Sequence, residues 1–227
     1  VPNYTGTGVY WKNVFPKMLM KNKGYIIAAD TDITLDFVSD LGETALFEKN
    51  QSETLTKAGN NKLVVHHDWN LIGNPYPSAY DLSNATQDHA PYYFYSDYGY
   101  QVAMADEELI VPPFKSLFVQ AYGPVNSITF YSSGRKLKAA NVSSTDEISL
   151  ILENANFSDK ARIRIQEDAS SGYDLGKDAV KFMSPEKEVP QLYSKSLGYN
   201  LSVSALPVGT SKVDLGMYIG EKGKYSI

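Results

Sequence analysis

The stretch Asp68–Ser78 reads DWNLIGNPYPS, and in it a strand-like apolar run meets a cluster of turn-forming residues. Successive side chains of a β-strand point to opposite faces of the sheet. The alternation predicts a strand over Trp69–Gly73, with Trp69, Leu71 and Gly73 on one face. Asn70 and Ile72 lie on the other. We expect the ring of Trp69 to be substantially buried, so that its removal unfolds the surrounding domain.

Two prolines predict that this strand stops abruptly. Pro75 has no backbone N–H to donate and holds Asn74 in an extended conformation. Pro77 restricts Tyr76 in the same way. The side-chain amide of Asn74 can bridge backbone groups in the turn that results. We therefore interpret this part of the chain as a rigid structural corner, whose members are Trp69, Asn70, Asn74, Pro75 and Pro77.

The composition of the 227-residue chain is that of an ordinary folded protein. Hydrophobic residues make up 43% of it and charged residues 21%, which argues against disorder. The net charge is −5 and the positive charges do not cluster, so neither nucleic acid nor an anionic membrane is an expected partner. No apolar run approaches the roughly 20 residues that cross a bilayer. The absence of cysteine excludes disulfides, metal–thiolate sites and thiol catalysis.

Alternation with a period of two recurs along the chain and predicts the fold class. The candidate strands are 24–28, 33–38, 62–66, 69–73, 92–96, 117–121, 127–131, 147–153, 161–167, 179–182, 191–194, 201–205, 213–219 and 224–227. Short runs of this kind, separated by turn residues, are typical of an all-β protein. We predict two consecutive antiparallel β-sandwich domains of jelly-roll type, over 1–136 and 141–227, with the boundary in the polar segment 132–144. The second domain is short, and we expect it to lack strands at its C-terminal end.

The familiar catalytic templates are missing from the sequence. It contains no Gly-X-Ser-X-Gly elbow, no phosphate-binding glycine loop and no His-Glu-X-X-His helix. His66 and His67 would point to opposite faces of a strand, so they cannot easily share one metal ion. A pair formed by one of them with Asp68 or His89 stays open. The favoured interpretation is that these histidines are solvated or serve as caps, and we expect neither a metal site nor a cofactor.

Three acidic segments are weaker candidates. The run 106–108 precedes an apolar strand, and we interpret it as a solvated turn because neighbouring like charges usually face water. The segments Asp30–Asp32 and Asp174–Asp178 could each contribute ligands to a calcium ion. Neither completes a loop of the EF-hand type.

The segment 92–100, with the sequence YYFYSDYGY, is the richest aromatic patch of the chain. Exposed tyrosine rings could stack on sugars while their hydroxyls form hydrogen bonds. The alternation places Tyr93 and Tyr95 on one face and Tyr92 and Phe94 on the other. At least one face should therefore be core, and we favour packing over ligand binding. The candidate ligand-binding residues are Tyr92, Tyr93, Tyr95, Tyr98 and Tyr100.

Trp69–Ser78 resembles the WNLIGNPYPS signature of large secreted and surface proteins of Bacteroidetes bacteria. In that family an aromatic strand and then a proline-preceded "FFV-A" strand follow the signature. Tyr92–Tyr95 and Pro112–Ala121 fill those places here. The family often has glycine and phenylalanine where this chain has Lys115–Leu117, a departure that leaves the strand pattern intact.

The second half of the chain resembles the β-domain that follows in such proteins. The segments that carry this likeness are 161–165, 172–174, 178–181, 190–194 and 201–203. The resemblance implies export, a multidomain parent protein and a role in adhesion, scaffolding or glycan recognition. It brings no catalytic residue with it.

These patterns lead to one favoured function and two alternatives. We expect a non-catalytic extracellular module of a larger secreted or surface-anchored bacterial protein, with an adhesion or scaffolding role. Its partners would be other domains of the parent protein, glycans or host and cell-surface proteins, without nucleic acid and without direct membrane insertion. The first alternative is a carbohydrate-binding module that uses exposed tyrosines of the first domain. The second is a glycan-active enzyme, which the missing templates disfavour.

Overall fold

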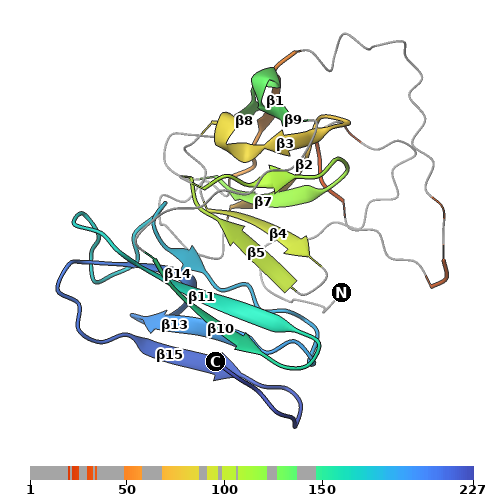
Figure 1. Cartoon of the computed structure of the whole chain (residues 1–227). Coiled ribbons are helices and arrows are strands. Elements are labelled where there is room, and N and C mark those ends of the chain that lie inside the picture. The colour runs from red at the N-terminus through yellow and green to blue at the C-terminus, as the bar shows by residue number, and fades with distance from the viewer. Residues whose placement is uncertain are drawn as a thin grey trace.

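The structure is a computed structural model, and it describes residues 20, 22–25, 30–32, 34, 49–57, 68–86, 91–96, 99–105, 107–121, 127–136 and 147–227. In this part of the chain the fold is all-β, as predicted, with two short 3₁₀ turns, η2 (Leu82–Asn84) and η4 (Ser132–Gly134). Figure 1 shows the yellow and green strands packed above a layer of cyan and blue strands. No helix among the described residues is long and apolar enough to cross a membrane.

The strands that precede residue 137 form three antiparallel sheets. The first pairs β1 (Gln51–Thr54) with β8 (Ser127–Phe130). The second has the order β2 (Trp69–Gly73), β7 (Ser116–Gln120), β4 (Tyr92–Ser96) and β5 (Gly99–Ala103). The third has the order β6 (Ile110–Val111), β3 (Ala79–Asp81) and β9 (Arg135–Lys136).

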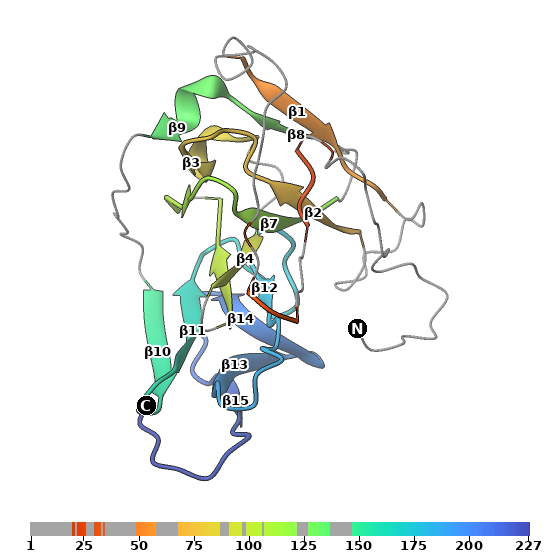
Figure 2. The same cartoon turned by 90° about the vertical axis from the view of Figure 1, so that its right-hand side faces the viewer.

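Both faces of the four-stranded sheet pack against other parts of the protein near β2. Ile72 and Leu117 are directly paired, and both are fully buried. They belong to an apolar core that also contains Tyr76, Tyr80 and Phe130. Because side chains alternate along a strand, the neighbouring residues of β2 and β7 face the other way. That second face lies against the C-terminal strands (Figure 2).

The strands after residue 146 form one six-stranded sheet. Its order is β10 (Glu147–Glu153), β11 (Ser158–Ile165), β14 (Tyr199–Leu206), β13 (Gln191–Ser196) and β15 (Asp214–Tyr218), and β12 (Ala179–Val180) pairs with β14. Its own core lies between β10, β11 and β13 and contains Leu152, Ala161 and Leu192. One pair in this otherwise antiparallel sheet is parallel, namely β11 with β14. The long connection through β12 and β13 allows this crossover.

Each described sheet draws its strands from one side of the segment 137–146. This segregation agrees with the predicted boundary, yet side chains from both sets share one apolar cluster. The division into two domains therefore stays a prediction.

The chain leaves β2 through a tightly hydrogen-bonded corner. The side-chain amide nitrogen of Asn74 lies 3.0 Å from the carbonyl oxygen of Ser78 and 3.1 Å from those of Val111 and Pro112. Its amide oxygen accepts a hydrogen bond of 3.0 Å from the backbone N–H of Tyr76. Asn74 thus ties the turn after β2 to the turn between β6 and β7.

The other residues of the corner fix its surroundings. Asn70 accepts from the backbone N–H of Thr56 at 2.7 Å and donates to its carbonyl at 3.0 Å. Pro75 is half-buried and Pro77 is exposed. A Cβ atom on Gly73 would approach the carbonyl oxygen of Lys23 to 2.9 Å, so only glycine lets that neighbouring backbone come so close.

Candidate functional site at the junction of the two sets of strands

The structure places two of the candidate tyrosines inside the protein. Tyr92 is 2% exposed and Tyr93 is 0% exposed. Their hydroxyls donate to the backbone carbonyls of Thr86, at 2.9 Å, and Val180, at 2.8 Å. Burial raises the pKa of Tyr93 well above its ordinary value, so this hydroxyl remains a hydrogen-bond donor. Neither ring is open to a ligand in this structure.

The remaining tyrosines differ from one another. Tyr95 is 41% exposed and contacts Tyr100 edge-on, with ring centroids 5.2 Å apart. Tyr100 is half-buried, and burial raises its pKa. Tyr98 lies outside the described residues. Of the predicted ligand-binding tyrosines that the structure describes, Tyr95 alone is exposed.

The other sequence candidates lie only in part within the described residues. His66, His67, His89 and Asp106 lie outside the described residues. Within the described ranges, no three or more histidine, aspartate and glutamate side chains meet in a way that could hold a metal ion. The carboxylate of Asp178 accepts hydrogen bonds from the backbone N–H groups of Ala205 and Asp174, at 2.7 and 2.5 Å. The protein's own donors therefore occupy this candidate calcium ligand.

An aromatic cluster joins the two sets of strands. The ring of Phe182, which follows β12, stacks on Tyr93 with centroids 4.1 Å apart and an interplanar angle of 14°. Trp69 and Tyr100 contact the same ring edge-on, at 5.1 and 5.3 Å. Phe118 of β7 completes the group at 5.9 Å. We call Trp69, Tyr93, Tyr100, Phe118 and Phe182 the aromatic junction.

Trp69, whose ring we expected to be substantially buried, is half-buried. It lies in the junction with the C-terminal strands. Ile72, on the opposite face of β2, belongs to the N-terminal core instead. The sequence predicted the alternation of β2 but could not show that both faces would be covered.

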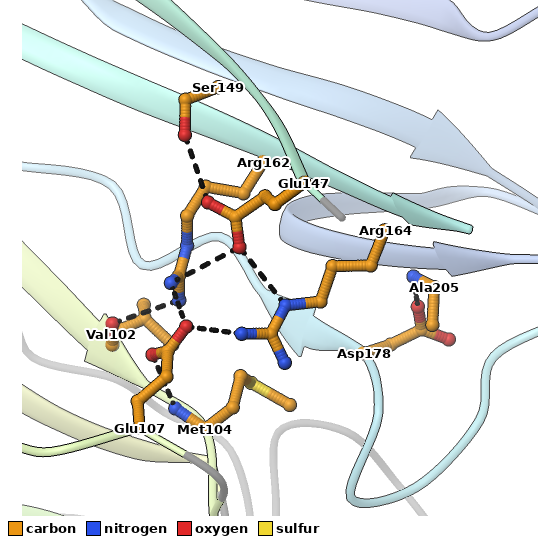
Figure 3. A network of polar contacts seen from close by, with 9 residues as sticks. All are labelled: Val102, Met104, Glu107, Glu147, Ser149, Arg162, Arg164, Asp178 and Ala205. Atoms are coloured by element: carbon orange, nitrogen blue, oxygen red, sulfur yellow. Dashed lines mark hydrogen bonds and ion pairs between the residues drawn. The ribbon is translucent and has the colours of Figure 1, made fainter. Parts of the chain in front are cut away.

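A charged cluster accompanies the aromatic one (Figure 3). One oxygen of Glu107 accepts from both Arg162 and Arg164, and its other oxygen accepts from the backbone N–H of Met104 at 2.9 Å. Glu147 of β10 pairs with Arg164 at 3.0 Å. The side chains of these four residues are only 4–14% exposed. We call Glu107, Glu147, Arg162 and Arg164 the charged junction.

The charged junction joins the two sets of strands directly. Both arginines project from β11 on the face opposite its apolar core, because Arg162 and Arg164 alternate with the buried residues Ala161 and Ile163. Glu107 comes from the loop after β5. Arg162 also donates to the carbonyl oxygen of Val102 on β5 at 3.0 Å.

Two positive and two negative side chains balance one another there. Burial alone would raise the pKa of Glu147, but the hydrogen bond from Arg164 and the charge of Arg162 outweigh it. The pKa of this carboxyl therefore lies below its ordinary value, and it is ionised at neutral pH.

The interpretation of residues 106–108 as a solvated turn is wrong for Glu107. Its carboxylate is nearly buried and bound by two guanidinium groups. The partners lie 55 and 57 residues further along the chain. No local signal distinguishes such a glutamate from its solvated neighbours, and only the alternation of arginine with apolar residues in 161–165 indicates a charged face in need of anions.

Two further buried polar groups hold β12 beneath the aromatic junction. Lys181 pairs with Asp159 at 2.5 Å, and burial lowers the pKa of this lysine. Burial also raises the pKa of Asp178 to about 6, against the effect of its two backbone donors. These contacts flank Val180, whose carbonyl receives the Tyr93 hydroxyl.

No protein-family model, curated protein or solved structure matches the chain. The interpretation of the junction therefore depends on its own chemistry. Its carboxylates are occupied by arginines, and its aromatic rings are covered by one another. Such an arrangement holds two layers of strands in one orientation, and it leaves neither carboxylate available as a general acid or base.

Proposed function

We propose that this chain is a non-catalytic extracellular module of a larger secreted or surface-anchored bacterial protein, with an adhesion or scaffolding role. The observation that carries the proposal is the nearly buried charged junction beside the aromatic junction. A module that spaces or presents other domains must keep its own parts in a fixed orientation. The resemblance of Trp69–Ser78 to the signature of exported surface proteins supports the extracellular assignment.

The chemistry of the two junctions is better suited to fixing the orientation of the two sets of strands than to strengthening their contact alone. Desolvating charged groups is costly, so a buried ion-pair cluster forms only where each partner is well placed. The Phe182 ring is likewise held in one position, stacked on Tyr93 and in edge-on contact with Trp69 and Tyr100. Sliding one set of strands over the other would break both sets of contacts together.

A mechanical measurement tests this proposal. The chain would be placed between two reference domains and stretched by single-molecule force spectroscopy. A rigid scaffold module unfolds both sets of strands in a single step. Two independent unfolding steps of unequal force would contradict the proposal, because they would show that the junction does not join the two sets of strands.

The alternative of a carbohydrate-binding module retains one supporting observation. Tyr95 is 41% exposed and contacts Tyr100 edge-on, and exposed tyrosine rings can stack on sugars. Screening the chain against a glycan array tests it. A saturable signal that Tyr95→Ala abolishes without changing the melting temperature would favour glycan binding over the scaffold role.

A further inference from the structure

One ion pair in the C-terminal sheet is almost sealed from solvent. The side chains of Lys181 and Asp159 are only 3% and 13% exposed. The Nζ atom of Lys181 lies 2.6 Å from one carboxylate oxygen of Asp159 and 2.5 Å from the other. Asp159 is paired across β10 and β11 with Leu152, a member of the apolar core of this sheet. The amine and the carboxyl group therefore meet at the edge of an apolar region.

The backbone holds both groups of this pair in place. Asp159 belongs to the β11 ladder, and its Oδ2 atom also accepts from the backbone N–H of Leu192 at 2.5 Å. Lys181 directly follows β12, and its backbone N–H donates to the carbonyl of Asn200 at 2.7 Å. Two groups fixed in contact and suitably oriented react as if at an effective concentration of about 10⁵–10⁸ M.

Burial also favours the reactive form of the amine. It lowers the pKa of Lys181, because the charged ammonium loses its hydration. An uncharged lysine amine is a nucleophile, whereas the ammonium ion is not. A proton that moves from Nζ to Oδ1 along the existing hydrogen bond turns the ion pair into an amine and a carboxylic acid. That transfer removes two charges from a site where charges are costly.

We propose that Lys181 and Asp159 condense to an amide that cross-links β11 to the residue after β12. The lone pair of Nζ forms a bond to Cγ of Asp159, and the bond from Cγ to Oδ1 breaks with its electron pair. Oδ1 leaves as water with the two protons that Nζ gives up. Oδ2 becomes the amide oxygen, and the N–H of Leu192 stabilises the negative charge that develops on it during the reaction.

The bond gives this chain a covalent link that needs no thiol. The sequence contains no cysteine, so no disulfide can constrain it. The amide joins residues that lie 22 positions apart. Like a disulfide, it restricts the unfolded chain and so favours the folded one. It also replaces two buried charges by a neutral group.

Mass spectrometry of the intact chain tests the proposal. The folded protein is kept at neutral pH until its mass is constant and is then denatured. It should be lighter than its sequence by one water molecule, and protease digestion should release a joined peptide that contains both Asp159 and Lys181. Lys181→Arg keeps the positive charge but has no primary amine, so this variant should have the full mass. If the variant does not fold, the mass and the digest of the unaltered chain still decide.

The same chain contains a solvated pair for comparison. The Nζ atom of Lys177 lies 2.7 Å from a carboxylate oxygen of Asp168, whose side chain is 79% exposed. This pair should stay unlinked in the same digest, because its groups remain hydrated and charged. Full mass in the unaltered chain would overturn the proposal. So would a link between Lys177 and Asp168, or a missing water without a joined peptide, which would indicate a cyclic imide at a single residue.

Discussion

Glu107→Gln is the sharpest test of the junction. The variant keeps the shape of the side chain but removes the charge that both Arg162 and Arg164 contact. Removing one partner of a buried ion pair costs about 3–5 kcal/mol. Glu147 still neutralises part of the remaining positive charge, so we expect a loss near the lower limit, about 3 kcal/mol. For a chain of this length that corresponds to a fall in melting temperature of roughly 6–12 °C.

The assay is urea unfolding at neutral pH, followed by tryptophan fluorescence and by circular dichroism. Glu108→Gln is the matched control, since it removes the same charge one residue away. Among the described residues, the ion pairs of this cluster involve Glu107 and not Glu108. It should change the unfolding free energy by less than about 0.5 kcal/mol. The deficit of Glu107→Gln should persist at about 0.5 M salt, because buried pairs are screened little. Equal losses in the two variants, or a loss that salt removes, would refute the reasoning.

Three further outcomes are expected. Phe182→Ala should lower the unfolding free energy, measured with urea, by about 3 kcal/mol through loss of its stack on Tyr93. The control Met183→Ala, at an exposed neighbour, should lower it by less than about 0.5 kcal/mol. Similar losses in the two variants would contradict the role of Phe182 in the aromatic junction. Asn74→Asp puts an acceptor where an amide donates to three carbonyls. It should lower the unfolding free energy by about 3 kcal/mol at neutral pH, and by less near pH 4, where the carboxyl can be protonated. A loss that is independent of pH would argue against these hydrogen bonds as its cause. The Asp178 carboxyl should titrate at about 6 by carbon NMR. Because this pKa exceeds the unfolded value of about 3.9, the protonated carboxyl stabilises the fold. That contribution is fully present below about pH 3.9 and is lost as the pH rises through 6. A titration midpoint near 4 would contradict the desolvation of Asp178.

The strands that the sequence predicted best are those with strong alternation or clear stops. β2, β4 and β10 have the predicted bounds. Each of these strands either alternates apolar with other side chains or consists of β-forming aromatics. In addition, β2 ends at Gly73 and is followed closely by Pro75. The candidate over 224–227 is present only as the single bridge at Ser226.

Two of the strands that the sequence missed are defined by their partners. β1 has the sequence QSET and β9 the sequence RK, neither with notable β propensity. β1 is a strand because it pairs with β8, and β9 because it pairs with β3. Long-range pairing thus overrides weak local preference at these places.

The candidate site was predictable only in part. Aromatic residues at 92–95 predicted packing, and Tyr92 and Tyr93 are indeed buried. The stacking partner Phe182 lies almost 90 residues beyond Tyr93, and Glu107 meets arginines more than 50 residues away. Contacts between distant segments leave no periodic signal in either one.

The order of strand pairing has a consequence for how the chain folds. In the C-terminal sheet, β10 with β11 and β13 with β14 are hairpins joined by short turns. In the N-terminal sheets, β1 pairs with β8 and β2 with β7 across connections of more than 40 residues. Distant pairings form slowly, because the chain entropy of closing the loop is lost before contacts repay it. We therefore expect these hairpins, and the equally local β4–β5 hairpin, to form first. Arg162 and Arg164 then stay hydrated until the slower pairings of the N-terminal sheets bring Glu107 into place.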